Sequence, residues 1–291
     1  MIPTYTLLAL AVVSLWFGGG ASTHGWRRHL WLGVGAASLG AALLAGIVAP
    51  VGLIGIAGFA AATYAFSRPT AGRTQIAVAA VGILILATGL MLHRVPGFRN
   101  PCVIAAVRFS PDAIPFTLYL NYDKTLVGLC LLGWCHARIA HWREWRTMLA
   151  IAAPRAVGLI VVLLALSLAA GYVRFAPKFP AESWLWLGVN LLFTCVAEEA
   201  LFRGFVQAQL QRFWKATSRG AMYALVLAAV VFGLAHAAGG ARYVLLATVA
   251  GLGYGWIYQR TQRIEASILA HFALNTVHFF LFTYPALAQV A

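Results

Sequence analysis

The sequence predicts an all-α fold, a polytopic transmembrane helical bundle of about ten spans. Of the 291 residues, 62% are apolar and only 10% are charged, whereas soluble domains carry about 25% charged residues. Long apolar runs alternate with short basic segments, which is the pattern of polytopic helical membrane proteins. The sequence lacks the apolar–polar alternation of a transmembrane barrel. Helices must therefore satisfy the backbone polar groups in lipid.

Ten apolar runs are candidate spans. They lie at 2–17, 30–48, 51–66, 75–92, 116–135, 155–173, 184–203, 221–238, 243–259 and 265–284. The second and third share one run that is too long for a single crossing of about 20 residues, so we divide it at Ala49-Pro50. The fifth run carries Asp123 and Lys124 in its middle. We expect its helix to start only near Thr125 or to be broken there.

The formal net charge of +14 reflects membrane topology rather than nucleic-acid binding. Lys and Arg are spread over the connecting loops, and the odd-numbered loops carry more of them than the even-numbered loops. The positive-inside rule then places the odd loops in the cytoplasm and both termini outside. The predicted partners are the lipid bilayer and a membrane-associated molecule, with no nucleic acid.

The front and back of the chain differ in character. The first four runs hold no ionisable residue well inside, whereas intramembrane polar groups concentrate beyond residue 190. We therefore divide the chain into accessory N-terminal helices with their connecting loop (1–115) and a working core (116–291). The segment 137–148 is either a basic, Trp-bearing interfacial helix or a solvated loop.

Two adjacent carboxylates and an arginine form the first polar group. Ionisable side chains inside a bilayer are costly and are functional candidates by default. Glu199 and Arg203 are four residues apart, so they share a helix face on which they can pair. Glu198 is rotated from Glu199 by about 100° and points elsewhere. One glutamate can then be held structurally while the other takes part in chemistry; alternatively, the Glu–Arg pair only joins helices.

Further polar groups come from the last three runs and from the fifth. His236 follows Phe232 by one helical turn. His271 and Asn275 are also four residues apart, and His278 continues their stripe, although we interpret His278 as a packed residue. The pair Asp123-Lys124 is interpreted as a helix-cap or interface feature.

The depths of these groups can be compared from the turns between helices. Glu198 and His236 lie equally far from a turn near Thr217, so paired helices would place them at one depth. His271 lies closer to its own turn near Gln262. The seventh helix must therefore project beyond the lipid or bend along the membrane surface.

The stretches "EEALFR", "FGLAH" and "HFALN" resemble the three motifs of the CPBP family of intramembrane endopeptidases (CAAX protease and bacteriocin-processing, also called ABI), which is related to type II CAAX prenyl proteases. The resemblance covers roughly residues 155–284. It implies a helical fold around a membrane-embedded cavity that cleaves peptide bonds near substrate C-termini. The implied roles follow the motif positions: water activation by Glu198 and His236, oxyanion stabilisation by His271 and Asn275, and support by Glu199 and Arg203.

Elementary chemistry agrees with these implied roles. Amide hydrolysis needs an activated water, a proton donor for the leaving amine and donors for the developing oxyanion. A buried carboxylate is a stronger base because burial disfavours its charged form, and a histidine can hold or relay the proton. The four cysteines have no paired metal spacing, and Cys195 has no local histidine, so a cysteine nucleophile is not indicated.

Two mechanisms remain open. In the glutamate–water version no cofactor is needed, and the resemblance favours this version. In the metal version Zn²⁺ would be bound by Glu198, His236 and His271, since two histidines and a carboxylate form a recognised catalytic set. The usual H-E-x-x-H spacing is missing from the sequence.

A non-enzymatic membrane protein is the competing class: a transporter, a proton relay or an immunity factor that binds its partner. For an enzyme, the resemblance implies a membrane-anchored protein or peptide as the substrate. The Ala-, Gly- and Arg-rich composition hints at a bacterial inner (plasma) membrane, where prenylated partners are not expected. Membrane-anchored proteins with a removable C-terminal tail, or secreted peptides, are then the expected substrates.

Overall fold

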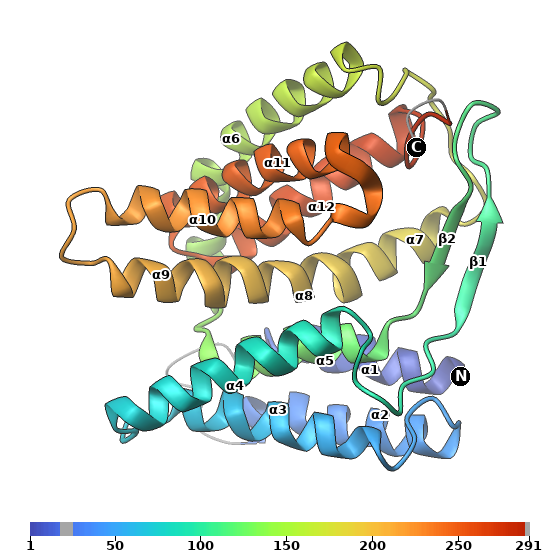
Figure 1. Ribbon diagram of the computed structural model, residues 1–291. Coiled ribbons are helices and arrows are strands. Elements are labelled where there is room, and N and C mark those ends of the chain that lie inside the picture. The colour runs from blue at the N-terminus through green and yellow to red at the C-terminus, as the bar shows by residue number, and fades with distance from the viewer. Residues whose placement is uncertain (18–25, 289–291) are drawn as a thin grey trace. The chain divides into compact units, whose positions relative to one another are not determined.

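The computed structural model describes residues 1–17 and 26–288. Within these residues the chain forms helices and one two-stranded sheet (Figure 1). Its residue contacts divide it into two compact units. The first comprises Met1–Pro101, Tyr119–His141 and Leu192–Leu201, and the second comprises Cys102–Leu118, Trp142–Leu191 and Phe202–Ala291. The predicted division at residue 115 concerns function rather than contacts, and it stays a prediction.

The first unit is built from apolar helices. They are α1 (Ile2–Ser14), α2 (Leu30–Leu44), α3 (Gly52–Ser67), α4 (Arg73–Met91), α5 (Tyr122–Cys130) and α8 (Val196–Glu199), with a 3₁₀ turn at Trp26–His29. Helix α1 packs on α2, α3 packs on α4, and α5 packs on α4 and α8. The predicted break between the second and third runs is confirmed: Gly46 adopts φ +66°, and Pro50 lies in the turn before α3.

The fifth predicted run is helical only in its second part. Strand β2 (Phe116–Tyr119) precedes α5, and Leu131–Cys135 continues α5 with wider, π-type turns. The expected late start of this helix, near Thr125, agrees with the structure to within three residues. The helix begins at Tyr122, so Asp123 and Lys124 lie in its first turn.

The second unit contains the remaining elements. They are β1 (Cys102–Val107), which pairs with β2, then α6 (Trp142–Ala169), α7 (Ser183–Val189), α9 (Ala208–Phe213), α10 (Gly220–Leu234), a 3₁₀ turn (Ala237–Gly239), α11 (Gly240–Thr261) and α12 (Ile264–Leu281). Helix α11 packs on α6, α10 and α12. Because α6 starts at Trp142, the helical alternative for 137–148 is correct from that residue onward.

One helix of 31 residues, Ser183–Phe213, supplies residues to both units. Its hydrogen bonding changes along its length, because Asn190–Cys195 and Ala200–Gln207 have π-type turns on either side of α8. Such turns are frequent at functional sites. The helix is continuous to Phe213, and the two alternatives for its end, beyond the lipid or along the membrane surface, stay predictions.

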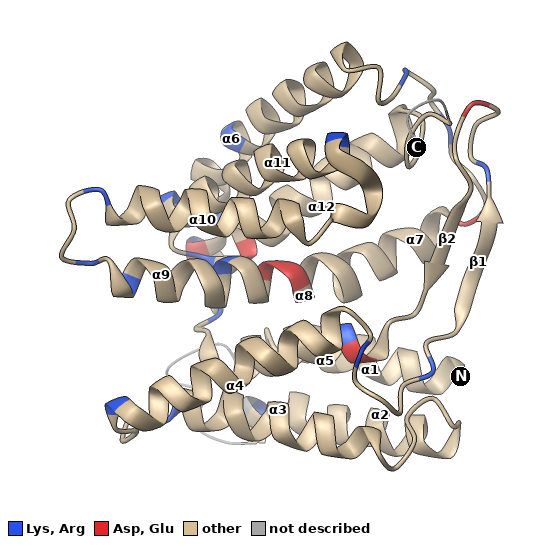
Figure 2. Cartoon of the chain, viewed as in Figure 1, with Lys and Arg blue, Asp and Glu red and all other residues tan. Residues whose placement is uncertain are grey.

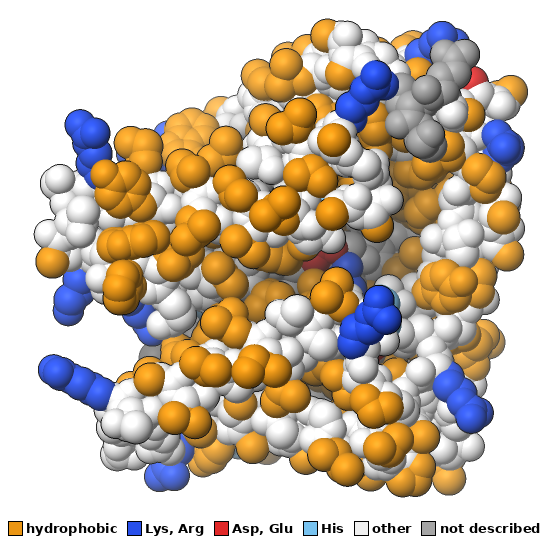
Figure 3. Space-filling model, in the orientation of Figure 1, with side chains coloured by type: hydrophobic (Ala, Val, Ile, Leu, Met, Phe, Trp, Pro, Cys, Tyr) orange, Lys and Arg blue, Asp and Glu red, His pale blue; other side chains and the backbone are white. Residues whose placement is uncertain are grey.

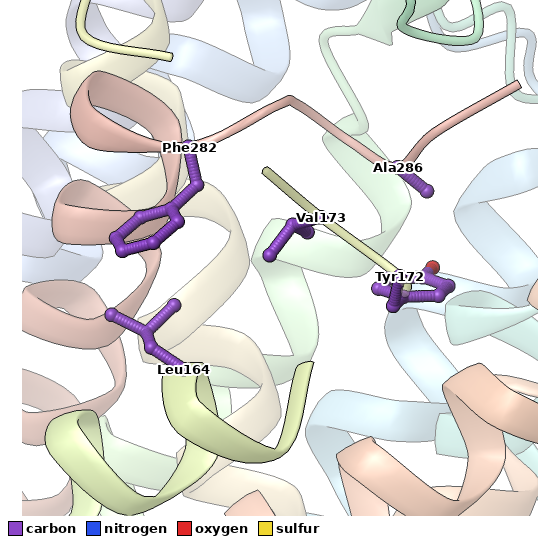
Figure 4. Packing of buried hydrophobic residues seen from close by; sticks show 5 residues of the cluster. All are labelled: Leu164, Tyr172, Val173, Phe282 and Ala286. Atoms are coloured by element: carbon purple, nitrogen blue, oxygen red, sulfur yellow. The ribbon is translucent and has the colours of Figure 1, made fainter. Parts of the chain in front are cut away.

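An apolar cluster joins the segment after α6 to the segment after α12 in the second unit (Figure 4). Its buried members are Leu164, Tyr172, Val173, Phe282 and Ala286. Backbone hydrogen bonds run beside this cluster, from Thr283 N to Arg174 O (2.8 Å) and from Leu287 N to Tyr172 O (3.0 Å). The end of α12 is thereby fixed against α6.

The surface is that of a membrane protein. Four helices in the described part of the chain are long and apolar enough to cross a membrane, or five if the pair α10–α11, bent by 57°, is one span; α1, α2 and α3 are shorter apolar helices. The predicted integral membrane helical fold is therefore supported, while the count of ten spans is not. Apolar side chains cover most of the face in Figure 3, and Lys and Arg lie mainly in loops and at helix ends (Figure 2).

Candidate functional site

Glu198 and Glu199 form the acidic part of the site and lie in α8, in the first unit (Figure 2). Both side chains are buried. The Glu198 carboxylate accepts a hydrogen bond from Lys124, with 2.6 Å between Oε1 and Nζ, and the exposed fractions of the two side chains are 8% and 15%. A carboxylate this deeply buried needs such a counter-charge, because an uncompensated ion is costly in a low-dielectric interior.

A close approach of α5 and α8 allows this ion pair to form. Gly128 has no side chain, and a Cβ placed there would lie 2.8 Å from the Cα of Ala197. Lys124 is one helical turn before Gly128, and Ala197 precedes Glu198 directly. The small residue at 128 therefore places the ammonium group within reach of the carboxylate.

Arg203 lies in the second unit, between two aromatic rings. Its Cζ is 4.2 Å from the ring centroid of Phe232 and 5.2 Å from that of Tyr254. The guanidinium also donates a hydrogen bond to the carbonyl of Gly251 at 3.1 Å. A guanidinium stacked on rings in this way is attracted by their π faces. Arg203 thus contacts both α10 and α11 and stabilises the packing of these two helices.

His236 lies where α10 ends. The chain breaks because Gly240 adopts φ +83°, a conformation that favours glycine. The His236 Nδ1–H donates to the carbonyl of Phe232 at 2.7 Å, which satisfies a carbonyl of the last helical turn. Because a carbonyl oxygen only accepts hydrogen bonds, Nδ1 is the donor nitrogen here. The imidazole also packs on Phe232, with ring centroids 4.6 Å apart.

His271 is buried in α12 and lies against the same aromatic residues. It stacks on Tyr254 with centroids 4.6 Å apart and an interplanar angle of 15°, and its centroid is 6.0 Å from that of Phe232. Four residues later, the Asn275 amide donates to Oδ1 of Asn190 at 3.4 Å. The side chains of His271 and Asn275 are therefore each oriented by a residue from another helix.

The structure brings some of the predicted residues together. In the second unit, Arg203, His236 and His271 all contact Phe232. Glu198 and Glu199 belong to the first unit. The pairing of Glu199 with Arg203 and the zinc set stay predictions. Among residues 1–17 and 26–288, no three His, Cys, Asp or Glu side chains form a cluster suited to a metal ion.

His278 is placed as a packed residue. Its Nε2 is 3.2 Å from the carbonyl of Thr283, and its ring packs on Tyr284 with centroids 5.1 Å apart. The sequence interpretation of His278 as a packed side chain agrees with these contacts, and we leave it out of the site.

Sequence reasoning missed three contacts. Lys124 was noticed, but its partner Glu198 is 74 residues away in the chain. Asn190 is a polar residue within an apolar helix, and that signal could have identified it. Tyr254 carries no such signal, because an aromatic residue in a membrane helix is ordinarily a packing residue.

The segment that holds the three motifs matches a known protein family. Residues 180–277 match the family described as Type II CAAX prenyl endopeptidase Rce1-like. This segment is similar to the CAAX protease family. The matched segment contains all three motif stretches, so the resemblance found from the motifs is confirmed. No curated protein and no solved structure matches the chain. The family is one of proteases, which are hydrolases. Lys124 lies outside the matched segment 180–277.

Proposed function

We propose that the protein is an intramembrane endopeptidase that hydrolyses a peptide bond near the C-terminus of a membrane-associated protein or peptide. One observation carries the proposal: His236 and His271, from different helices, both pack on Phe232. Two imidazoles fixed around one ring are suited to proton transfer and to hydrogen-bond donation at a single reacting group.

In the proposed mechanism Glu198 and His236 activate a water molecule. Glu198 takes a proton as the water oxygen forms a bond to the carbonyl carbon, and the carbonyl electron pair moves onto its oxygen. The resulting oxyanion accepts hydrogen bonds from His271 and from the Asn275 amide. When the C=O bond re-forms, the C–N bond breaks, and the proton held by Glu198 and His236 passes to the leaving nitrogen.

The remaining predicted residues support this chemistry. Arg203 holds Phe232 and Tyr254, the rings on which the two histidines pack. Glu199 is fully buried beside Glu198. We assign both a structural role in the site. Each acts on the reaction through the residues that it positions.

We extend the proposal to topology and location. The ten helical segments are taken as ten spans, with 1–115 as accessory helices and 116–291 as the protease core, in a bacterial inner membrane. The substrates would be membrane-anchored proteins with a removable C-terminal tail or secreted peptides. Reporter fusions to each loop test the topology, since ten spans require every successive loop to change sides.

The first experiment compares membrane-protein C-termini by mass spectrometry in cells that express wild type or Glu198→Gln. We expect particular proteins to keep longer C-termini only with the variant. Western blotting and detergent-solution melting check that the variant is folded and abundant. If such a variant leaves every terminus unchanged, the proposed endopeptidase activity is wrong, and a binding or transport role becomes the better explanation.

Metal analysis of the same purified protein separates the two mechanisms. The zinc alternative requires about one Zn²⁺ per chain, with zinc lost from Glu198→Gln, His236→Ala and His271→Ala, and activity abolished by a chelator. The glutamate–water mechanism predicts full activity after chelation. Elemental analysis by mass spectrometry and a chelator titration give the answer.

A further inference from the structure

We propose that Lys124 is a positioning residue for the reaction, acting through Glu198. This inference rests on the proposed function and adds a residue that lies outside the segment 180–277 matched by the protease family. The ion pair between Lys124 and Glu198 is short, at 2.6 Å, and both side chains are largely buried. A charge-assisted hydrogen bond of this kind is strong and directional.

The first turn of α5 is fixed by a polar cluster of Asp123, Asn100 and His93, in which the His93 side chain is 41% exposed. Asp123 is fully buried and accepts three hydrogen bonds: from His93 Nδ1 (2.8 Å), from Asn100 Nδ2 (2.9 Å) and from the backbone N–H of Lys124 (2.9 Å). Asn100 Oδ1 in turn accepts from the backbone N–H of Tyr122 at 2.9 Å. The backbone that carries Lys124 is therefore held in place before its side chain reaches Glu198.

The close packing of α5 on α8 also constrains where Lys124 lies relative to Glu198. Gly128 lets α5 approach the backbone of Ala197, the residue before Glu198. A lysine side chain has four flexible bonds, and ordering them costs entropy. The Asp123 cluster and the close approach at Gly128 hold the backbone of α5 in place, so only the lysine side chain remains to be ordered when the ion pair forms.

Two consequences follow for Glu198. The ammonium offsets part of the cost of burying the carboxylate. It also fixes the plane of the carboxylate, because Oε1 is bound to Nζ. A misplaced base costs far more in the chemical step than in substrate binding. Loss of Lys124 should therefore lower kcat and leave KM largely unchanged.

The competing explanation is an ion pair that only joins α5 to α8. Chemical rescue separates the two explanations. A small amine that binds beside Glu198 can restore the missing positive charge, but it cannot link α5 to α8 because it is not attached to α5. The test uses the full-length protein in lipid nanodiscs and the substrate identified by the C-terminal comparison. The variants are Lys124→Ala, Lys124→Arg and the matched control Lys215→Ala, which removes an exposed lysine.

We expect kcat of Lys124→Ala to fall about 100-fold, with KM changed by less than about twofold. Ethylamine should restore part of this loss with saturation, and it should not act on Glu198→Gln. Lys124→Arg, which keeps the charge, should retain more activity than Lys124→Ala. Lys215→Ala should match the wild type.

The outcomes distinguish the inference from the proposed function. A wild type without any peptidase activity removes the proposed function and the role of Lys124 with it. An active wild type beside a folded Lys124→Ala of equal kcat overturns the inference alone. So does a loss that follows the melting temperature of the variants and does not respond to ethylamine.

Discussion

The surroundings of Glu198 and those of the two motif histidines are built from different interactions. In the first unit, Glu198 is bound by Lys124, and the helical turn that carries Lys124 is anchored by Asp123 with its three donors. In the second unit, His236 and His271 pack against aromatic rings, and His236 also donates a hydrogen bond to a backbone carbonyl. Charge organises one neighbourhood and aromatic packing organises the other.

The difference follows from what each group needs before it can react. A carboxylate that must stay charged in a low-dielectric interior requires a counter-charge. An imidazole that transfers a proton requires a fixed ring orientation, to which a hydrogen bond and packing against flat rings contribute. The two neighbourhoods should therefore respond differently to substitution.

The largest effect is expected for His236→Ala. Removal of a group that transfers protons lowers kcat by about 10²- to 10⁴-fold. Because the imidazole is only half-buried, the variant should fold. A peptidase assay with the purified protein measures the loss, and His29→Ala, far from the motifs in the sequence, is the control. Equal activity in both variants would remove His236 from the mechanism.

The second effect concerns stability in the charged neighbourhood. Asp123→Leu leaves three donors without their acceptor, so we expect the free energy of unfolding to fall by about 2–4 kcal/mol. Asp112→Leu is the matched control, since its carboxylate is partly exposed and lies 3.8 Å from Nη1 of Arg174. Urea or thermal unfolding in detergent compares the two. If Asp123→Leu costs no more than the control, charge does not organise this region.

A smaller effect tests the packing of the aromatic neighbourhood. Gly233 follows Phe232, and a Cβ there would lie 2.8 Å from the carbonyl oxygen of Val244 and collide with Thr248. Gly233→Ala should separate α10 from α11 at a cost of about 1–3 kcal/mol. Gly158→Ala has open space around it and should be neutral or slightly stabilising. Melting temperatures that rank the two variants in the opposite order would contradict this packing.

The smallest expected effect is a change in how the melting temperature depends on pH. It concerns Lys178, which is bound by backbone carbonyls, whereas Lys124 is bound by a carboxylate. Lys178 donates to the carbonyls of Ala176 and Phe282, and burial lowers its pKa to about 8 from 10.5, an effect that Asp112 partly opposes. Between these pH values the unfolded chain holds a proton that the folded chain has released. Stability therefore rises with pH across this window. Lys178→Met should remove that rise in melting temperature, and an unchanged rise would contradict the assignment.

Many of the helices could be predicted from the sequence, because the length of an apolar run depends only on residues that are neighbours in the chain. The run 265–284 became α12, and the run 30–66 broke at Pro50 as expected. The sheet did not follow, because the apolar segment Cys102–Val107 has no local sign that it pairs with Phe116–Tyr119. Strand pairing depends on contacts outside the segment. The count of ten spans also exceeded what helix length alone supports.

The candidate site was predictable to a similar degree. Motif spacing identified His236 and His271, but it could not reveal that Phe232 lies between them and Arg203. Spacing on one helix suggests Glu199 as the partner of Arg203, which stays a prediction, but it could not reveal the rings of α10 and α11 that lie against the guanidinium. The partner of Glu198 is on α5, so no pattern within α8 could indicate it.

The break after α10 also bears on the supply of water. Residues 237–240 form an exposed, irregular turn directly after His236. In the ten-span topology that we propose, this turn joins two separate spans and lies at the aqueous boundary of the bilayer, since irregular backbone that faces lipid is not found in the hydrocarbon core. His236 is then within one turn of bulk solvent. The water molecule that attacks the peptide bond would then cross only a short distance within the membrane, and the scissile bond would have to lie near this aqueous boundary.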